Sequence, residues 1–220
     1  IPINQPFGKA LIGKGVIETL EMTLISTILA YIIGVPYGVL LKVTGKGEIM
    51  EQKVVNKIFA FIANVFRSIP FLILLVFLIP FTRAIVGTSI GTEASIVPLT
   101  VGTIPIVARM VEQSLNEIPY RITEAAKSMG ANSWQIVKEF IIPEAMPSLC
   151  SGTAINTATV LGYSAMAGCI GGGGLGALAL NYGYYRYQND VLFLTVLVLV
   201  VVVQVIQESG VLISKRIRHS

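Results

Sequence analysis

Two glycine-rich stretches have spacings that could bind a nucleotide, and each lacks a part that the chemistry needs. GKALIGKG, residues 8–15, has the spacing of a phosphate-binding loop, but Gly15 stands where a Ser or Thr hydroxyl would hold magnesium. GGGGLG, residues 171–176, contains the G-x-G-x-x-G pattern, yet it follows a long apolar run and opens no βαβ unit. We therefore do not expect this chain to bind a nucleotide.

Hydrolytic and metal-dependent chemistry is not expected either. GYSAMAG, residues 162–168, contains a serine but lacks the second glycine of a nucleophile elbow. One histidine, His219, and one aspartate, Asp190, cannot build a catalytic triad or a metal cluster. Cys150 and Cys169 are interpreted as small side chains buried in the membrane. The sequence predicts a non-catalytic chain that binds no cofactor and no metal.

The elements that carry these residues are those of an integral membrane protein. Of the 220 residues, 54% are hydrophobic and 13% are charged, whereas roughly 25% of residues are charged in soluble domains. About 20 apolar residues cross a bilayer core as a helix. The predicted fold class is therefore an all-α membrane protein, a single domain with five transmembrane helices. The expected spans are residues 17–42, 58–82, 94–114, 147–170 and 191–213.

The basic residues predict the orientation of these spans. Eleven Lys and Arg residues fall on one side and four on the other, and Arg67 is left out because it lies inside a span. The positive-inside rule then places the amino terminus outside and the carboxyl terminus in the cytoplasm. The first residues show no cleavable signal peptide, and because the chain opens at Ile1, its natural amino terminus is left open. The larger set is Lys42, Lys46, Lys53, Lys57, Arg109, Arg121, Lys127, Lys138, Lys215, Arg216 and Arg218, and the smaller is Lys9, Lys14, Arg83 and Arg186.

A charged segment, residues 118–143, separates the third and fourth spans and is expected to be cytoplasmic. Pro119 is well placed as the first residue of a helix, and Gly130 supplies a left-handed stop. The spacing predicts one apolar face on this helix, formed by Ile122, Ala125, Ala126 and Met129.

A second short helix is predicted after the stop. Asn132 or Ser133 can cap it, it runs from Trp134 to about Ile141, and Pro143 is expected to end it. The pair could be a connector that rests on lipid headgroups. Small alanines flanked by both charge signs instead favour docking into a groove of another protein.

The segment resembles the EAA loop of ABC importer permeases. Glu124, Ala125 and Ala126 stand six to four residues before Gly130, and Pro143 follows thirteen residues after it. Phe140 and Ile142 replace the Ile and Leu that are most common in the family, and they keep the apolar character. The resemblance implies a coupling helix that fits a cleft on a separate ATPase. The implied coupling residues are Glu124, Ala125, Ala126, Lys127, Met129, Gly130 and Pro143.

Further stretches are similar to methionine importer permeases, a five-helix branch of this family. They are NVFRSIPFLILLVFLIPFTRAIVGTSIG, IVPLTVG, VARMVE, GYSAM and GGLG. The resemblance implies import of D- or L-methionine across a bacterial inner membrane by alternating access. It also implies a homodimer, two ATP-binding cassette subunits that hold ATP and magnesium, a substrate-binding protein or lipoprotein outside, and contact with membrane lipid but not with nucleic acid. A permease for another small amino acid or organic solute is the alternative, followed by a self-sufficient channel or carrier.

Residues of the translocation pathway are expected among polar or helix-breaking positions in the spans. Arg67 is interpreted as a structural or gating residue in preference to a substrate contact. Met166 could touch a thioether substrate or simply pack. Gly34, Pro36 and Gly38 in the first span, and Thr100, Thr103 and Pro105 in the third, could bend their helices or pack them. The candidate pathway residues are Arg67, Ser68, Pro70, Asn156, Thr159, Tyr163, Ser164 and Met166.

Overall fold

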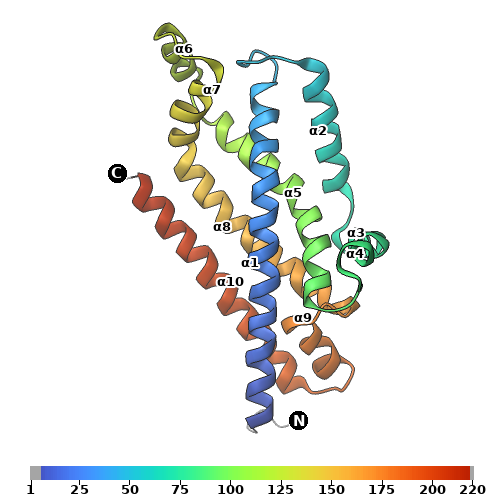
Figure 1. Ribbon diagram of the computed structural model, residues 1–220. Helices are drawn as coiled ribbons and strands as arrows, with labels where there is room; N and C mark the ends of the chain where they lie inside the picture. The colour runs from blue at the N-terminus through green and yellow to red at the C-terminus, as the bar shows by residue number, and fades with distance from the viewer. Residues whose placement is uncertain (1–5, 219–220) are drawn as a thin grey trace. The chain divides into compact units, whose positions relative to one another are not determined.

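The computed structural model describes residues 6–218, most of which are helical, and no strand occurs among them (Figure 1). An apolar run in a bilayer must satisfy its own backbone hydrogen bonds, and a helix does this within one segment. Three described helices are long and apolar enough to cross a membrane, or up to five if each of two bent pairs counts as one span. The helices are α1 (Pro6–Val43), α2 (Lys53–Ser68), α3 (Phe71–Phe77), α4 (Ile79–Val86), α5 (Thr92–Asn116), α6 (Tyr120–Ser128), α7 (Ser133–Gln135), α8 (Ile142–Ala167), α9 (Gly174–Leu178) and α10 (Asn189–Arg218).

Short turns of other helix types join some of these helices. A π-helical stretch, η1 (Ile136–Ile141), joins α7 to α8, and a second one, η3 (Ala179–Tyr184), follows α9. A 3₁₀ turn, η2 (Gly168–Ile170), ends α8. The helix that contains the fourth predicted span therefore ends where the sequence indicates, at Ile170.

The second predicted span, residues 58–82, is interrupted where Arg67, Ser68 and Pro70 indicate, and its crossing of the membrane as one broken span stays a prediction. The chain leaves the helical conformation between Ser68 and Phe71, and α2 and α3 form a bent pair at that break. Pro70 explains the interruption, because its ring disfavours the α conformation at Ile69 and it has no N–H to donate. The following helices α3 and α4 lie against each other (Figure 1).

The chain divides into two compact units, which are described separately. The first unit comprises Ile1–Ala30, Ile69–Thr103 and Thr157–Gln207, and the second comprises Tyr31–Ser68, Ile104–Asn156 and Glu208–Ser220. The core of the first unit contains a ring stack, in which Phe71 and Tyr163 lie parallel with centroids 4.2 Å apart. Around this pair lie the buried side chains of Met22, Leu75, Leu99, Val160 and Ala167, with Ile170 packed against them.

In the second unit, α1 and α5 approach each other closely at two glycines. A methyl group added to Gly34 would lie 2.7 Å from Val107 Cγ1, and one added to Gly38 would lie 2.5 Å from the carbonyl oxygen of Ala108. Real Cβ atoms do not make such contacts, so this part of α1 requires the glycines for packing. Gly34 and Gly38 could bend α1 or allow it to pack closely, and these contacts favour close packing.

Candidate functional site

The predicted elbow in residues 118–143 is present. Helix α6 begins at Tyr120 with Pro119 as its N-cap, one residue later than expected. Gly130 has φ +81°, which confirms the left-handed stop. Its N–H donates to the Lys127 carbonyl at 2.9 Å and the Ala131 N–H donates to the Ala126 carbonyl at 3.1 Å. These two hydrogen bonds form a Schellman motif and fix the turn after α6.

The second helix of the elbow is capped by Asn132. Its side-chain oxygen accepts from the Gln135 N–H at 2.9 Å, and the Gln135 side chain accepts from the Asn132 N–H at 2.9 Å. This reciprocal pair is a capping box, and it identifies Asn132 rather than Ser133 as the cap. Helix α6 packs against η1, which continues this second helix.

Pro143 does not end the second helix, and that prediction is wrong. The helix continues without interruption from Ser133 to Ile170. The π-helical stretch Ile136–Ile141 lies directly before Pro143, and its last turn is closed by the Ile142 N–H, which donates to the Val137 carbonyl. A π turn is wider than an α turn, so the ring is accommodated where an ordinary helix would clash with it. The elbow is therefore joined rigidly to α8.

The exposed face of α6 differs from the predicted one. Thr123 and Ala126 are buried, whereas Ala125 and Met129 are exposed, Met129 to 68%. The helix is thus rotated so that Thr123 replaces Met129 on the inner face. The exposed side chains of the elbow include Glu124, Ala125, Lys127, Met129 and Trp134.

Of the residues around the break after α2, Ser68 and Pro70 have local structural roles. Ser68 Oγ donates a hydrogen bond to the Asn64 carbonyl at 2.8 Å, in the last turn of α2. Pro70 is the N-cap residue of α3. Arg67 is exposed, and it makes no ion pair or hydrogen bond with any described residue.

The polar residues of α8 do not form one accessible face. Asn156 is buried in the second unit and its Nδ2 donates to the Tyr31 hydroxyl at 3.4 Å. In the first unit, Ser164 is buried and donates to the Leu161 carbonyl at 2.7 Å, and Tyr163 is held in the ring stack. Thr159 is half-buried, and Met166 is 44% exposed.

Sequence reasoning counted Arg109 only as a cytoplasmic charge, but in the structure it forms a polar network with three other residues of the second unit. Arg109 Nη1 donates to Glu112 Oε2 at 2.6 Å. Arg109 Nη2 donates to the carbonyl oxygen of Ala60 at 3.0 Å and to Asn64 Oδ1 at 2.8 Å, so the side chain links α5 to α2. The sequence shows an arginine and a glutamate three residues apart, a spacing that predicts an ion pair on one helix. It does not indicate that Arg109 also binds Ala60 and Asn64 on α2.

A cavity of about 350 Å³ with both polar and apolar lining residues lies in the second unit. It brings together two of the predicted pathway residues, Arg67 and Asn156, with Arg109. Further lining residues come from α5 and the segment after it and from α8, and they are Ile106, Met110, Gln113, Ser114, Glu117, Ser148, Ser151, Gly152 and Ile155.

The GGGGLG stretch is a structured turn in the first unit. The Gly174 N–H donates to Glu18 Oε2 at 2.8 Å, and the Leu175 N–H donates to Thr19 Oγ1 at 2.9 Å. A methyl group on Gly176 would lie 2.7 Å from the carbonyl carbon of Ala165, so the backbones touch. The glycines permit this contact, and the side chains of α1 satisfy the first N–H groups of α9.

No group of three His, Cys, Asp or Glu side chains that could hold a metal ion occurs in the part of the chain that the structure describes. The described residues define a helical membrane protein with polar positions in its apolar helices and an exposed helical elbow. Residues 34–219 match the family of binding-protein-dependent transport system inner membrane components, which covers most of the chain. The chain belongs to this family.

Individual proteins of known name are also similar to this chain over most of its length. Over 209 residues the chain is 47% identical to the probable D-methionine transport system permease protein MetI of Pasteurella multocida, covering 95% of this chain and 96% of the relative. It is 53% identical over 158 residues to the D-methionine transport system permease protein MetI of Salmonella typhimurium, covering 72% and 73% of the two chains.

Solved structures agree with the family assignment. The fold matches a chain from an inward-facing conformation of the MetNI methionine ABC transporter with a TM-score of 0.95 at 47% identity, over 97% of this chain and 99% of the other. A chain of an amino acid ABC transporter solved with histidines matches with a TM-score of 0.78 at 20% identity, over 94% of each chain. The second likeness shows the fold alone.

Proposed function

We propose that this chain is the permease subunit of an ATP-driven importer that carries methionine, as the D or L form, across a bacterial inner membrane. The observation that carries the proposal is the likeness to the methionine transporter chain, which extends over 97% of this chain at a TM-score of 0.95. The chain itself is non-catalytic, and the energy comes from ATP and magnesium on a partner ATPase.

The elbow is the proposed coupling site. Helix α6 and the residue after it present an exposed patch of small, charged and flexible side chains, formed by Glu124, Ala125, Lys127 and Met129. Gly130 holds the turn, and Ala126 and the helix that contains Pro143 support the patch from beneath. Because that helix continues into α8 without a break, displacement of the elbow by an ATPase would move α8 as well.

The assembly and orientation follow from the same proposal. Two copies of the chain form a homodimer with the pathway between them, two ATP-binding cassette subunits sit on the elbows, and an extracytoplasmic binding protein or lipoprotein supplies the substrate. The amino terminus lies outside and the elbow and carboxyl terminus lie in the cytoplasm, in agreement with the positive-inside count.

The pathway is proposed to include polar positions from both units. Arg67, Ser68 and Pro70 mark a helix break at which the backbone can line a route, and Arg67 has an uncommitted guanidinium. Asn156, Thr159 and Met166 are the α8 positions proposed to meet the substrate or its route. Tyr163 and Ser164 are proposed to shape the same helix from its packed side.

Reconstituted transport tests the proposal. Proteoliposomes would contain the permease, its ATPase and ATP, with binding protein loaded with labelled methionine outside. We expect uptake that requires the ATPase and that falls at least tenfold in Glu124→Arg, because reversed charge on the exposed patch disrupts docking. Uptake by the permease without any ATPase would contradict the proposal.

Glu144→Arg is the matched control. Glu144 is also an exposed glutamate, and it lies on α8 beyond the elbow. It should retain both uptake and copurification of the ATPase. Equal losses in the two variants would show that charge reversal acts through the general stability of the permease, and the coupling assignment of Glu124 would be withdrawn.

A further inference from the structure

We propose that the 350 Å³ cavity of the second unit is a transient binding site for the substrate, a zwitterionic α-amino acid with a flexible apolar side chain. This inference rests on the proposed function and adds a site within the permease to it. The cavity is at the lower end of the range of small-molecule sites, roughly 300–1,000 Å³, so it suits one small solute.

The cavity offers a guanidinium for the carboxylate of the ligand. Arg67 lines it and has no ion pair or hydrogen bond with a described residue, so its fork of N–H donors is free to bind a carboxylate. Arg109 lines it too, but its terminal nitrogens are used by Glu112, Ala60 and Asn64. The remaining donor, Arg109 Nε, is buried and has no partner among the described residues, which leaves one N–H for a ligand or water.

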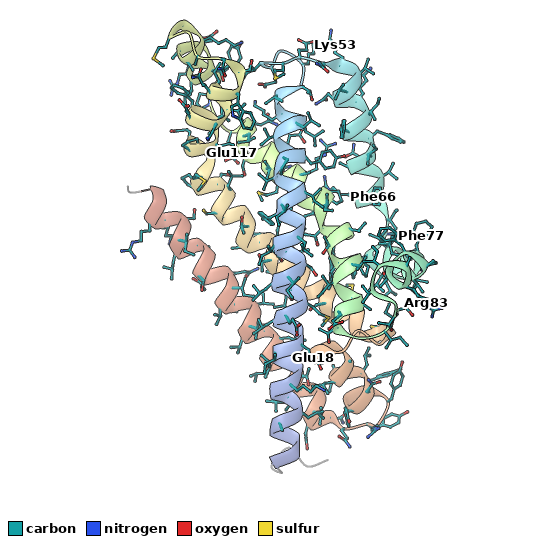
Figure 2. The ribbon with its side chains drawn as sticks, viewed as in Figure 1. Glu18, Lys53, Phe66, Phe77, Arg83 and Glu117 are labelled. Carbon is teal, nitrogen blue, oxygen red and sulfur yellow. The ribbon has the colours of Figure 1, made fainter. Side chains whose placement is uncertain are left out.

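The same cavity offers a carboxylate for the ammonium group. Glu117 is exposed and lines the cavity just beyond the end of α5 (Figure 2). None of the ion pairs among the described residues involves Glu117, whereas Glu112 is already neutralised by Arg109 at 2.6 Å. Among the described residues, the cavity therefore holds one unpaired guanidinium, that of Arg67, and one unpaired carboxylate, that of Glu117. These two charges complement a zwitterion better than they complement a simple anion or a simple cation.

A thioether wall completes the site. Ser148 Oγ donates to Ser114 Oγ at 3.0 Å, and Ser114 Oγ in turn contacts Met110 Sδ at 3.8 Å. A methyl group on Gly152 would lie 2.5 Å from Met110 Sδ, so the glycine provides the space in which the thioether lies. Methionine is soft and adaptable, and with Ile106 and Ile155 it forms an apolar surface for the ligand's side chain.

The position of the cavity makes its occupancy depend on the elbow. Its α8 residues, 148–156, belong to the helix that runs continuously from Ser133 to Ile170. A movement of the elbow therefore moves one wall of the cavity relative to Met110 on α5. We infer that the substrate occupies the site in one conformation and is released when that wall shifts.

Photolabelling of the complete transporter tests this site. The permease with its ATPase would be placed in nanodiscs with a methionine analogue that carries a diazirine in its side chain, and the adducts would be mapped by mass spectrometry. We expect adducts in residues 106–117 or 148–156 that excess unlabelled methionine removes. Adducts confined to other segments would overturn the inference.

Substitutions separate this site from the transport function. We expect Arg67→Gln and Glu117→Gln each to lower the competed labelling of the cavity at least tenfold, and Arg67→Lys, which keeps the charge, to restore part of it. Arg83→Gln is the control, because Arg83 is an exposed arginine on α4 of the first unit whose side chain bonds only Ser89 among the described residues (Figure 2). Labelling unchanged in monodisperse Arg67→Gln and Glu117→Gln transporters would refute the site.

Uptake in the wild type distinguishes the two proposals. If ATP-driven methionine uptake occurs but the cavity is not labelled, only the binding site is wrong. If the wild type shows no ATP-driven methionine uptake, the proposed function fails and the site fails with it.

Discussion

The two units hold their helices together by different means. In the first unit, the contact around GGGGLG is between backbones, and its polar groups are satisfied inside the protein by Glu18 and Thr19. In the second unit, close packing at Gly34 and Gly38 is accompanied by the Arg109 network and a cavity. Backbone contact leaves no side chain to rearrange, whereas a charged network beside a cavity can exchange partners. We infer that the first unit maintains a fixed geometry and that the second contains the parts that change.

The backbone contact of the first unit gives the largest expected effect. In Gly176→Val the added atoms would meet the backbone of Ala165, which cannot rotate away as a side chain can. We expect a loss of more than about 4 kcal/mol of stability, in the range of severe core changes. The measurement is the yield of monodisperse protein after extraction from the membrane, which should fall to near zero.

Gly162→Ala provides the control in the same unit. Gly162 lies on α8, and an added methyl group would have no atom within 4 Å. Alanine is favoured over glycine in a helix by ~1 kcal/mol, so this variant should be extracted as well as the wild type or better. A similar loss of yield in both variants would mean that the close contact at Gly176 is not the cause, and the contrast between the units would weaken.

The parts of the fold that could be predicted from sequence are those determined by near neighbours. Gly130 ends α6 and Asn132 caps α7 because such signals act over one turn of chain. Hydropathy identified the apolar helices, and Arg67, Ser68 and Pro70 indicated that the second span is interrupted, as it is between Ser68 and Phe71. Pro70 acts on the residue next to it, so this signal is local too.

The parts that could not be predicted depend on residues far apart in the chain. The acceptors of the Gly174 and Leu175 N–H groups, Glu18 and Thr19, are 156 residues away. The cavity similarly combines Arg67 with residues 106–117 and 148–156. A pattern of spacing within one helix does not indicate which helix will face it, so the polar positions were identified but their grouping was not.

The charged network of the second unit gives the second largest effect. Arg109→Gln removes the ion pair to Glu112 and the link to Ala60 and Asn64 on α2. Breaking a largely buried pair leaves an uncompensated charge, so we expect a loss of about 3 kcal/mol. The melting temperature of the purified protein, followed by tryptophan fluorescence or a thiol-reactive dye, measures it.

Arg67→Gln separates stability from ligand binding in this network. Arg67 lines the same cavity but has no partner among the described residues, so its loss should leave the melting temperature within the error of the wild type. If Arg67→Gln and Arg109→Gln lowered the melting temperature equally, Arg67 would be a structural residue. The distinction between the hydrogen-bonded guanidinium of Arg109 and the unpaired one of Arg67 would then be wrong.

The smallest expected effect is confined to the elbow of the second unit and tests how far along the helix the capping box at Asn132 stabilises it. Asn132→Ala removes the acceptor of the Gln135 N–H and half of the capping box, at a cost of about 1 kcal/mol. Since α7 is only the first turn of a helix that continues to Ile170, we expect faster amide hydrogen exchange at residues 133–136 with little change beyond η1. Asn132→Ser keeps an acceptor oxygen and should restore most of the protection. If exchange instead increased along the whole of α8, the capping box would stabilise the entire helix, and the assignment of a local effect to Asn132 would be wrong.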